Sequence, residues 1–490
     1  MTFTNLGGFL LFDVDEAVFS QASKEMLLSK DLINPTYNGL NRYDKPILIY
    51  WLMSLSYALF GVSEFSARLT SAVSGIILCI VLFIFVKRHT NPETGIYALL
   101  VFAFSIYYFI YSRAAVTDML LTLFISLALF NFYFAKKVRQ ILLFHLFCAL
   151  AFLTKGLIGV VFPYGISICY IIFTRQWYRL RLLFNPLGIL VFLVVAMPWY
   201  IAQYQRNGME FIQQFFFKHH FQRYTDVISG HKGPFYYYLI TLLIGMSPWI
   251  LFLPSGIKRG YPDKTGIGGF ALVWFAFVFV FFSLSTTKLP NYILPCIPAV
   301  AILIAISMKE HQGNLVKIIL TIGAVAMFIS TIFILPKILE RFGISDIRWL
   351  YLIGFINLFS IGLFWIRFKQ ESLRYVSIAL CMFLIFIIVS IKGLPLASEV
   401  LQGDLYRFSQ YAREKLNEDE RIMVYKINHP SIVFYSDRRV IRVGAMDEAR
   451  EMLDKVPYKL LITRNRFKED VIKLGFRERF SGREYALFER

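Results

Sequence analysis

Long apolar runs follow one another along most of this chain and limit its fold more than any other feature. A helix needs about 20 apolar residues to cross about 30 Å of hydrocarbon. A soluble fold could not bury the 50 phenylalanines of a 490-residue chain that is 57% hydrophobic. The sequence therefore predicts a polytopic α-helical membrane protein with twelve spans, at about 66–86, 93–112, 116–135, 140–154, 156–174, 183–204, 235–257, 267–286, 290–308, 314–335, 349–366 and 374–392.

The loops between these runs alternate in positive charge. One set, which includes KRHTN (87–91) and KKVRQ (136–140), holds 16 Lys and Arg residues, whereas the short loops of the other set hold 6. Because Lys and Arg are enriched in cytoplasmic loops, the first set is predicted to be cytoplasmic. The opening segment, the connection 205–234 and the tail after residue 392 then lie outside. The net charge of +19 belongs to these membrane-surface loops and does not indicate nucleic-acid binding.

Two domains are predicted, divided near residue 395. Residues 1–395 form the membrane domain, in which 13–60 is the first outer loop and its short Trp- and Tyr-rich part, 47–60, is an interfacial helix. Residues 396–490 are richer in charge and form a small soluble α/β domain outside the membrane. Its strand-like runs are RIMVYKI, SIVFYS, RRVIRV and KLLITR, and its helical patterns include MDEAREMLDK. The opening MTFTNLGGFLLF is too short to span and is expected to be the tail of a first helix whose beginning is missing.

Ionisable residues in or beside the apolar runs are the candidates for function. Charges near hydrocarbon are costly and usually face a cavity or a partner. Under the predicted topology these residues all lie on the outer side, which predicts a polar pocket open to that side. Cations there suit a lipid phosphate, and carboxylates suit a general base or sugar hydroxyls, so a glycosyl carrier lipid is the expected ligand. The candidates are Asp15, Glu16, Asp44, Lys45, Arg113, Asp118, Lys155, His219, His220, Arg223 and Lys288.

All of these candidates except Arg223 also have a purely structural interpretation. The acids Asp15 and Glu16 would favour the dipole at a helix N-terminus. Asp44 and Lys45 would pair at the start of a helix with Pro46 at its first position. Similarly, Arg113 would pair with Asp118 across a turn, Lys155 and Lys288 would reach to the membrane interface, and His219 and His220 would have no role. The sequence leaves these alternatives open.

The segment DVDEAVFSQASKEMLLSKDLINPTYNGLNRYDKPILIYW (13–51) resembles the first outer loop of the bacterial family that transfers aminoarabinose to lipid A. That family belongs to the membrane glycosyltransferases that include the protein O-mannosyltransferases. The resemblance covers nearly the whole membrane region, and its DE…(D/E)KP and KLPxYxLP elements specify the family but neither sugar nor acceptor. It continues in order through AVTDML (115–120), LTKG (153–156), HHFQRY (219–224), GPFYYY (233–238), SPWI (247–250) and KLPNYILPCIPA (288–299).

The resemblance implies roles for individual residues. Asp15 matches the catalytic aspartate of the first outer loop, with Glu16 beside it, and Asp118 matches a second aspartate of the outer face. Two cations, Lys45 and Arg223, match positions that hold the carrier phosphate. Tyr292 matches a tyrosine that lines the same cavity. The same-sided cations Lys155, Lys288 and Arg113 complete the predicted substrate site.

The resemblance also implies a cell location and a fold. We expect an enzyme of the bacterial inner membrane, with thirteen spans in the family and with its active site and C-terminal domain on the periplasmic side. The resemblance implies no definite cofactor, and a divalent metal is a candidate, with Asp44, His219 and His220 as its ligands. At Asp44 the chain departs from the family, which usually has glutamate at this position.

The expected reaction moves a sugar from an undecaprenyl phosphate carrier to an acceptor, and the family implies inversion at the anomeric carbon. Aminoarabinose and lipid A are the leading sugar and acceptor. A protein O-mannosyltransferase or another glycan transferase is the alternative. A transporter or lipid flippase is disfavoured, because transporters place charged sites near the midplane of repeated halves, and this chain has its charges at one edge and no visible repeat.

Overall fold

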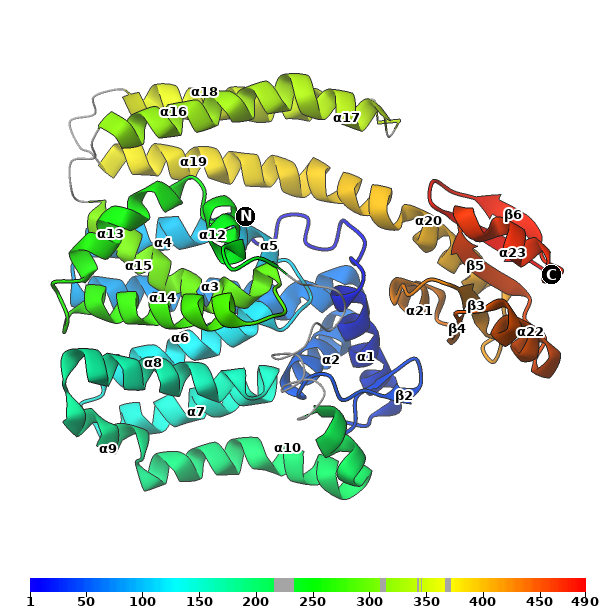
Figure 1. The fold of residues 1–490 in the computed structure, drawn as a ribbon, viewed down its shortest axis with the longest axis horizontal. Helices are drawn as coiled ribbons and strands as arrows, with labels where there is room; N and C mark the ends of the chain where they lie inside the picture. Colours follow the sequence, from blue (N-terminus) through cyan, green and yellow to red (C-terminus); the bar gives the residue numbers. More distant parts are fainter. Residues whose placement is uncertain (216–232, 309–313, 342, 345, 366–371) are drawn as a thin grey trace. The chain divides into compact units, whose positions relative to one another are not determined.

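The structure is a computed structural model that describes residues 1–215, 233–308, 314–341, 343–344, 346–365 and 372–490 (Figure 1). The described chain forms two compact units. The first contains Met1–Thr4, Tyr43–Ile49 and Thr70–Val389, and the second contains Asn5–Arg42, Tyr50–Leu69 and Ser390–Arg490. Most of the predicted first outer loop (13–60) thus groups with the C-terminal residues, whereas the sequence predicts a single boundary near residue 395.

The first unit is helical, and most of its long helices lie side by side with roughly parallel axes (Figure 1). Its core is rich in aromatic rings, such as Phe85 stacked on Phe130 at 3.9 Å between centroids. Its elements are most of α3 (Glu64–His89), then α4 (Pro92–Ala103), α5 (Ile106–Tyr111), α6 (Asp118–Phe134), α7 (Val138–Lys155), α8 (Ile158–Thr174), α9 (Leu180–Leu183), α10 (Pro186–Ile212), α12 (Tyr237–Gly245), α13 (Leu253–Gly260), α14 (Ile267–Leu284), η5 (Pro290–Cys296), α15 (Ile297–Ser307), α16 (Asn314–Ile329), α17 (Leu335–Arg341), α18 (Arg348–Trp365) and α19 (Ser372–Ile388).

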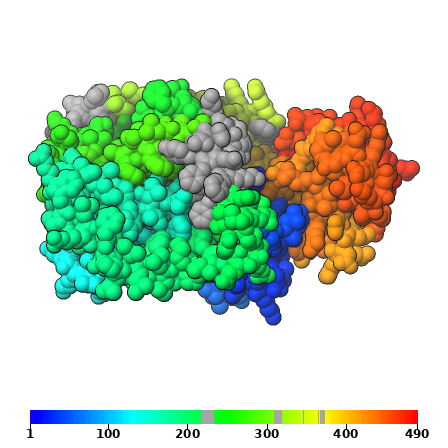
Figure 2. Space-filling view, turned by 60° about the horizontal axis from the view of Figure 1, so that its bottom comes forward, coloured from blue at the N-terminus to red at the C-terminus, as the bar shows by residue number. Residues whose placement is uncertain are grey.

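Seven helices in the described ranges are long and apolar enough to cross a membrane, or eight if one bent pair is counted as a single span. Side chains of α10 explain why a lipid environment is needed. Leu187, Leu190 and Val194 are all more than half exposed, although they are apolar. In Figure 2 the teal-green α10 segment lies at the surface of the face shown. The polytopic α-helical prediction agrees with these helices, while the number of twelve spans stays a prediction.

Two of the predicted runs are not single helices. Run 93–112 is divided into α4 and α5, because the Ser105 hydroxyl accepts a hydrogen bond from Tyr108 N (3.1 Å) and so begins a new helix. Run 235–257 is divided into α12 and a second piece, Trp249–Gly260, at an angle of 111°. Pro248 lies at this break; it has no N–H and disfavours the helical conformation for the residue before it.

The second unit combines two helices from the N-terminal 60 residues with a small α/β fold. The C-terminal sheet has the strand order β4-β3-β5-β7-β6, with β3 parallel to β4 and β5 and with β7 antiparallel to its neighbours. Its elements are α1 (Asp15–Ser29), β1 (Thr36–Tyr37), β2 (Leu40–Asn41), α2 (Leu48–Phe60), which begins in the first unit, α20 (Leu394–Lys415), β3 (Ile422–Tyr425), α21 (Ser431–Ser436), β4 (Val440–Val443), α22 (Met446–Lys455), β5 (Leu460–Arg464), α23 (Lys468–Ile472), β6 (Arg477–Ser481) and β7 (Tyr485–Glu489).

Alternate residues of the central strand β3 fill two separate cores. Ile422 and Val424 pack with Leu405 and Phe408 of α20, whereas Met423 and Tyr425 pack on the other face of the sheet. Side chains of a strand point to opposite faces in turn, so this strand is buried on both sides.

The prediction that SIVFYS (431–436) is a strand is wrong, because this segment is helix α21. All six residues are buried, so the segment has no polar face from which a helical period could be recognised. Pro430 begins the helix, and Asp437 ends it in the left-handed conformation at φ 55°.

Candidate functional site

Asp118 and Lys155 form a buried ion pair in the first unit. Asp118 is the first residue of α6 and Lys155 is the last residue of α7, and Lys155 Nζ donates to Asp118 Oδ1 at 2.7 Å. The exposed fractions of the two side chains are 6% for Asp118 and 12% for Lys155. Because the two side chains are largely removed from water, each charge is stabilised mainly by the other. Removing either residue would leave a buried charge without its partner.

Two residues of η5 complete this cluster. Asn291 Nδ2 donates to the same Asp118 oxygen at 3.1 Å. The Lys155 ammonium lies 5.5 Å from the centre of the Tyr292 ring, and that ring packs on Phe282 at 5.1 Å. Four residues from three separate elements therefore meet, and they combine a carboxylate, an ammonium, an amide and an aromatic face. Such a set can bind a polar ligand through its hydroxyl groups and through an anionic oxygen.

Lys288 and Arg113 bind backbone carbonyl groups of the first unit. Lys288 Nζ donates to the carbonyls of Phe282, Ser283 and Ser285, at 3.2, 2.8 and 2.8 Å, where α14 ends. The Arg113 guanidinium donates to the carbonyls of Met1, Thr2 and Thr4, with distances of 2.8 Å to Thr2 and 3.1 Å to Thr4. These contacts favour an anchoring role for both cations, and the substrate-binding role predicted for them stays a prediction.

Asp44 and Lys45 lie just before helix α2. Lys45 Nζ donates to the carbonyl oxygen of Asp44 at 3.1 Å, and both side chains are partly buried. The helix begins at Leu48, so Pro46 precedes it rather than occupying its first position. The predicted binding of a carrier phosphate by Lys45 stays a prediction.

Glu16 and Arg68 form a second buried ion pair, within the second unit. Arg68 Nε lies 3.0 Å from Glu16 Oε1 and Arg68 Nη2 lies 3.0 Å from Oε2, and the Arg68 side chain is 0% exposed. The remaining Arg68 donors reach the carbonyls of Leu6, Phe9 and Leu10 at 2.9–3.0 Å. Arginine suits this place because its planar fork matches a carboxylate and can serve several acceptors.

Asp15 is exposed, although it is the direct neighbour of the buried Glu16. Both acids stand in the first turn of α1, where negative charge favours the helix dipole. Glu16 Oε2 also accepts from Phe12 N at 2.9 Å. The structural interpretation of the pair therefore applies to Glu16, whereas Asp15 keeps its carboxylate at the surface of the second unit.

The remaining predicted residues cannot be placed in this arrangement. Arg223, His219 and His220 lie outside the described residues. Within the described part of the chain, no group of three or more His, Cys, Asp or Glu side chains could hold a metal ion. The other two predicted metal ligands, His219 and His220, lie outside the described residues, so a metal bound by Asp44 and these histidines stays a prediction.

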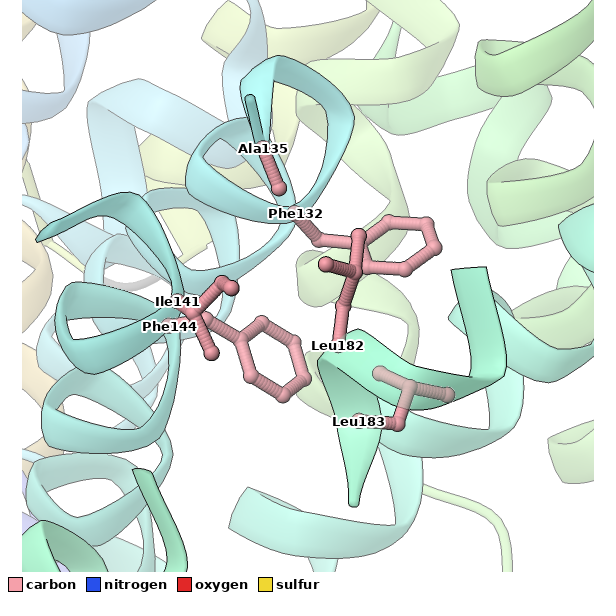
Figure 3. A pocket seen from close by; sticks show the side chains of 6 residues that line it. All are labelled: Phe132, Ala135, Ile141, Phe144, Leu182 and Leu183. Atoms are coloured by element: carbon pink, nitrogen blue, oxygen red, sulfur yellow. The ribbon is translucent and has the colours of Figure 1, made fainter. Parts of the chain in front are cut away.

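A small apolar pocket lies between the ends of α6, α7 and α9 (Figure 3). It is lined by Phe132, Ala135, Ile141, Phe144, Leu182 and Leu183, which point their carbon side chains toward one another. No polar group lines it, so it offers nothing that could orient a sugar or a phosphate.

Arg68 and Asn291 are not among the residues predicted from the sequence. Arg68 is a single cation at the start of the first apolar run, and its partner Glu16 is 52 residues earlier in the chain. Asn291 lies within the KLPNY motif but carries no charge, so it does not stand out among the ionisable residues. An arginine inside an apolar run was the available signal for the first of these.

Comparison with known proteins assigns a family. A family model described as dolichyl-phosphate-mannose-protein mannosyltransferase matches residues 44–201. A relative from Edwardsiella ictaluri, named undecaprenyl phosphate-alpha-4-amino-4-deoxy-L-arabinose arabinosyl transferase, is 32% identical over 319 residues, which cover 63% of this chain and 57% of the relative. An uncharacterized protein from Aquifex aeolicus is 33% identical over 320 residues, which cover 64% of this chain and 73% of that protein.

Solved structures show the same fold. The crystal structure of ArnT from Cupriavidus metallidurans bound to undecaprenyl phosphate matches with a TM-score of 0.84 at 22% identity, covering 99% of this chain and 95% of that one. An archaeal oligosaccharyltransferase from Archaeoglobus fulgidus matches with a TM-score of 0.51 at 12% identity, over 93% of this chain and 66% of the other. The chain spans less than three fifths of the length of the Edwardsiella transferase. With its long apolar helices, this integral membrane protein belongs to the glycosyltransferase family that contains the undecaprenyl phosphate aminoarabinose transferases and is related to the protein mannosyltransferases.

Proposed function

We propose that this chain transfers 4-amino-4-deoxy-L-arabinose from undecaprenyl phosphate to lipid A. The observation that carries the proposal is the buried cluster of Asp118, Lys155 and Asn291, in a chain whose fold matches a transferase crystallised with undecaprenyl phosphate. The names of the relatives supply the sugar and the carrier. An ammonium beside a carboxylate and an amide suits a ligand that is part phosphate and part sugar.

In the proposed reaction an acceptor oxygen forms a bond to the anomeric carbon while the bond from that carbon to the carrier phosphate breaks. Negative charge then develops on the leaving undecaprenyl phosphate. Lys45, Lys155 and Arg223 would stabilise it, because cations fixed where charge develops lower the barrier. The amide of Asn291 and the carboxylate of Asp118 would orient the sugar.

The role of Asp15 depends on the acceptor. A lipid A phosphate is already largely ionised at neutral pH, since its second pKa is about 6. Asp15 would then orient the acceptor and stabilise the sugar as positive charge grows on it, without taking a proton. A hydroxyl acceptor is far less acidic, and Asp15 would have to remove its proton as a general base.

The proposal includes a topology. The proposed chain has twelve spans, which correspond to twelve of the thirteen spans expected in the family. This arrangement would place the site and the C-terminal α/β part on the periplasmic side of the bacterial inner membrane. Alkaline phosphatase fused after Arg490 would be active in this arrangement, because that enzyme folds only outside the cytoplasm. An inactive fusion in cells that make the full-length protein would contradict it.

A second candidate function is protein mannosyl transfer. The description of the family model that matches residues 44–201 supports this alternative. Mass spectrometry of lipid A, from bacteria with and without the gene, separates the two. The proposal predicts lipid A species that carry one added aminoarabinose only when the gene is expressed. An unchanged lipid A profile, together with the loss of mannose from secreted proteins, would establish the alternative instead.

A further inference from the structure

The segment that leads into Asp15 is held by side chains from the C-terminal part of the second unit. Leu10 N donates to Ser398 Oγ at 3.2 Å, and Leu11 N donates to Tyr435 OH at 2.8 Å. The Tyr435 hydroxyl donates in turn to Glu64 at 2.9 Å, and burial, followed by this carboxylate, raises its pKa well above the usual value. Backbone groups outside helices and strands need such partners once they are buried.

Asp13 has the most extensive contacts in this segment. Its Oδ1 accepts from Ser431 N at 2.8 Å, and its Oδ2 accepts from Ser431 Oγ at 2.5 Å and from His429 Nδ1 at 3.1 Å. In the amide orientation that satisfies both groups, Gln402 donates to the Asp13 carboxylate at 2.9 Å and accepts from Asp13 N at 3.3 Å. The Asp13 side chain is 4% exposed, so these contacts fix it inside the unit.

His429 is oriented on both sides. Its Nε2 lies 2.9 Å from the Tyr485 hydroxyl, and burial raises the pKa of that hydroxyl. Since Nδ1 lies 3.1 Å from Oδ2 of the Asp13 carboxylate, Nδ1 carries a hydrogen. Ser431, His429 and Asp13 contain the residue types of a nucleophilic triad, but the Ser431 hydroxyl donates to the carboxylate and not to the histidine. The hydroxyl therefore stabilises the Asp13 carboxylate and is not activated by the histidine, so the arrangement fixes Asp13.

Asp15 thus lies between two buried carboxylates. Asp13 is held by Ser431 and His429, and Glu16 is held by the fork of Arg68. Asp15 itself is exposed between them. An exposed carboxylate on a backbone that is fixed on both sides is preorganised, and a displacement of about 1 Å at a reacting group can cost about 100-fold in rate.

We propose that Asp13 is a positioning residue, and that the C-terminal α/β part uses Ser431 and His429 to hold the Asp15 backbone in the place that transfer requires. This rests on the proposed function, because it assigns Asp15 a role in the transfer. It gives the C-terminal part a task within the reaction itself.

The test uses the full-length chain in lipid nanodiscs, with undecaprenyl phosphate aminoarabinose as donor and lipid A as acceptor. Asp13→Ala and Ser431→Ala should each lower kcat by about 10- to 100-fold, while the donor KM changes by less than about twofold. Asp13→Asn keeps an acceptor oxygen for Ser431 and should retain a larger share of kcat than Asp13→Ala. Ser431→Ala leaves Asp13 intact, so it serves where Asp13→Ala does not fold.

Asn38→Gly is the matched control. The Asn38 side chain also joins the first outer loop to the C-terminal sheet, through bonds of 2.7 and 2.9 Å to the backbone of Val440, but it lies away from Asp15 in the chain. Glycine accepts the positive φ of 57° at this place. The control should keep the wild-type kcat. An equal loss of kcat in the control would overturn the specific role of Asp13.

Amide hydrogen exchange of residues 10–19 gives a readout that does not depend on activity. Exchange should be faster in Asp13→Ala than in the wild type and in Asn38→Gly. Unchanged exchange, or a wild-type kcat in Asp13→Ala, would overturn the positioning role and leave the proposed function standing. A wild-type chain that transfers no sugar to lipid A would instead overturn the proposed function, and the positioning role with it.

Discussion

Lys155 Nζ lies 2.7 Å from Asp118 Oδ1, which joins the last residue of α7 to the first residue of α6. The same carboxylate oxygen accepts from Asn291, so two donors share it. Asp118 is therefore committed to holding its neighbours, and it suits a binding role better than proton removal. Asp15, which is exposed, is the better candidate for direct action on an acceptor.

Removing Lys155 should destabilise the protein, because Asp118 would be left buried without its counter-charge. Lys155→Met should lower the stability by about 3 kcal/mol, and the double variant Lys155→Met with Asp118→Leu should recover much of the loss. Thermal unfolding of the purified variants and the wild type, all in the same detergent, measures the stability of the single and the double variant. Equal losses in the single and the double variant would show that the pair contributes no coupled stability.

Replacing Arg68 by lysine should not be tolerated, although the charge is kept. Lysine cannot bind both oxygens of Glu16 and also reach the carbonyls of Leu6, Phe9 and Leu10. Arg68→Lys should reduce stability by about 2 kcal/mol, since several buried acceptors lose their donors. A melting temperature equal to that of the wild type would contradict this prediction.

Lys288 and Lys45 should respond differently to substitution. Lys288 Nζ is bound by three carbonyls at the end of α14, so Lys288→Ala should lower the melting temperature and leave the donor KM nearly unchanged. Lys45→Ala should raise the donor KM with little effect on stability. Kinetics with undecaprenyl phosphate aminoarabinose, beside thermal unfolding, separate the two. The assignment fails if Lys288→Ala is the variant with the weaker donor binding.

Asn291→Asp should make transfer sensitive to pH. The substitution places a second carboxylate about 3 Å from that of Asp118, and two like charges at that distance cannot both remain ionised without a large cost. Activity should be low at neutral pH and should rise relative to the wild type as the pH falls, because one proton shared by the pair restores a donor. Rate profiles from pH 5 to pH 8 test this, and Asn291→Ala controls for the loss of the amide. Parallel profiles for the two variants would argue against a direct contact in solution.

The membrane class and most of the helices could be predicted from the sequence, because apolar runs of spanning length depend only on composition. The breaks inside such runs were harder to predict. Pro248 lies at one break and Ser105 begins a new helix at the other, but proline and serine also occur inside membrane helices, so neither residue alone identifies a break. Segment 431–436 was assigned to a strand because its residues are apolar and partly β-branched, and complete burial removed the polar face of a helix.

The candidate site could be predicted only in part. Asp118, Lys155 and Tyr292 were all named from the sequence, and the structure brings them together. Their pairing could not be predicted, because it depends on where α6, α7 and η5 meet. Arg68 was missed for the same reason, since its partner Glu16 becomes its neighbour only in the folded chain.

The most direct test of the account is transfer by the purified full-length chain in nanodiscs, wild type against Asp15→Asn. Asparagine keeps the size of the side chain but cannot carry the negative charge. The account predicts that the wild type converts lipid A into a product with one added aminoarabinose, and that Asp15→Asn, folded and with unchanged donor binding, forms the product at least about 100-fold more slowly. Equal rates for the two proteins would contradict the role of Asp15, and no product from the wild type would contradict the proposed reaction.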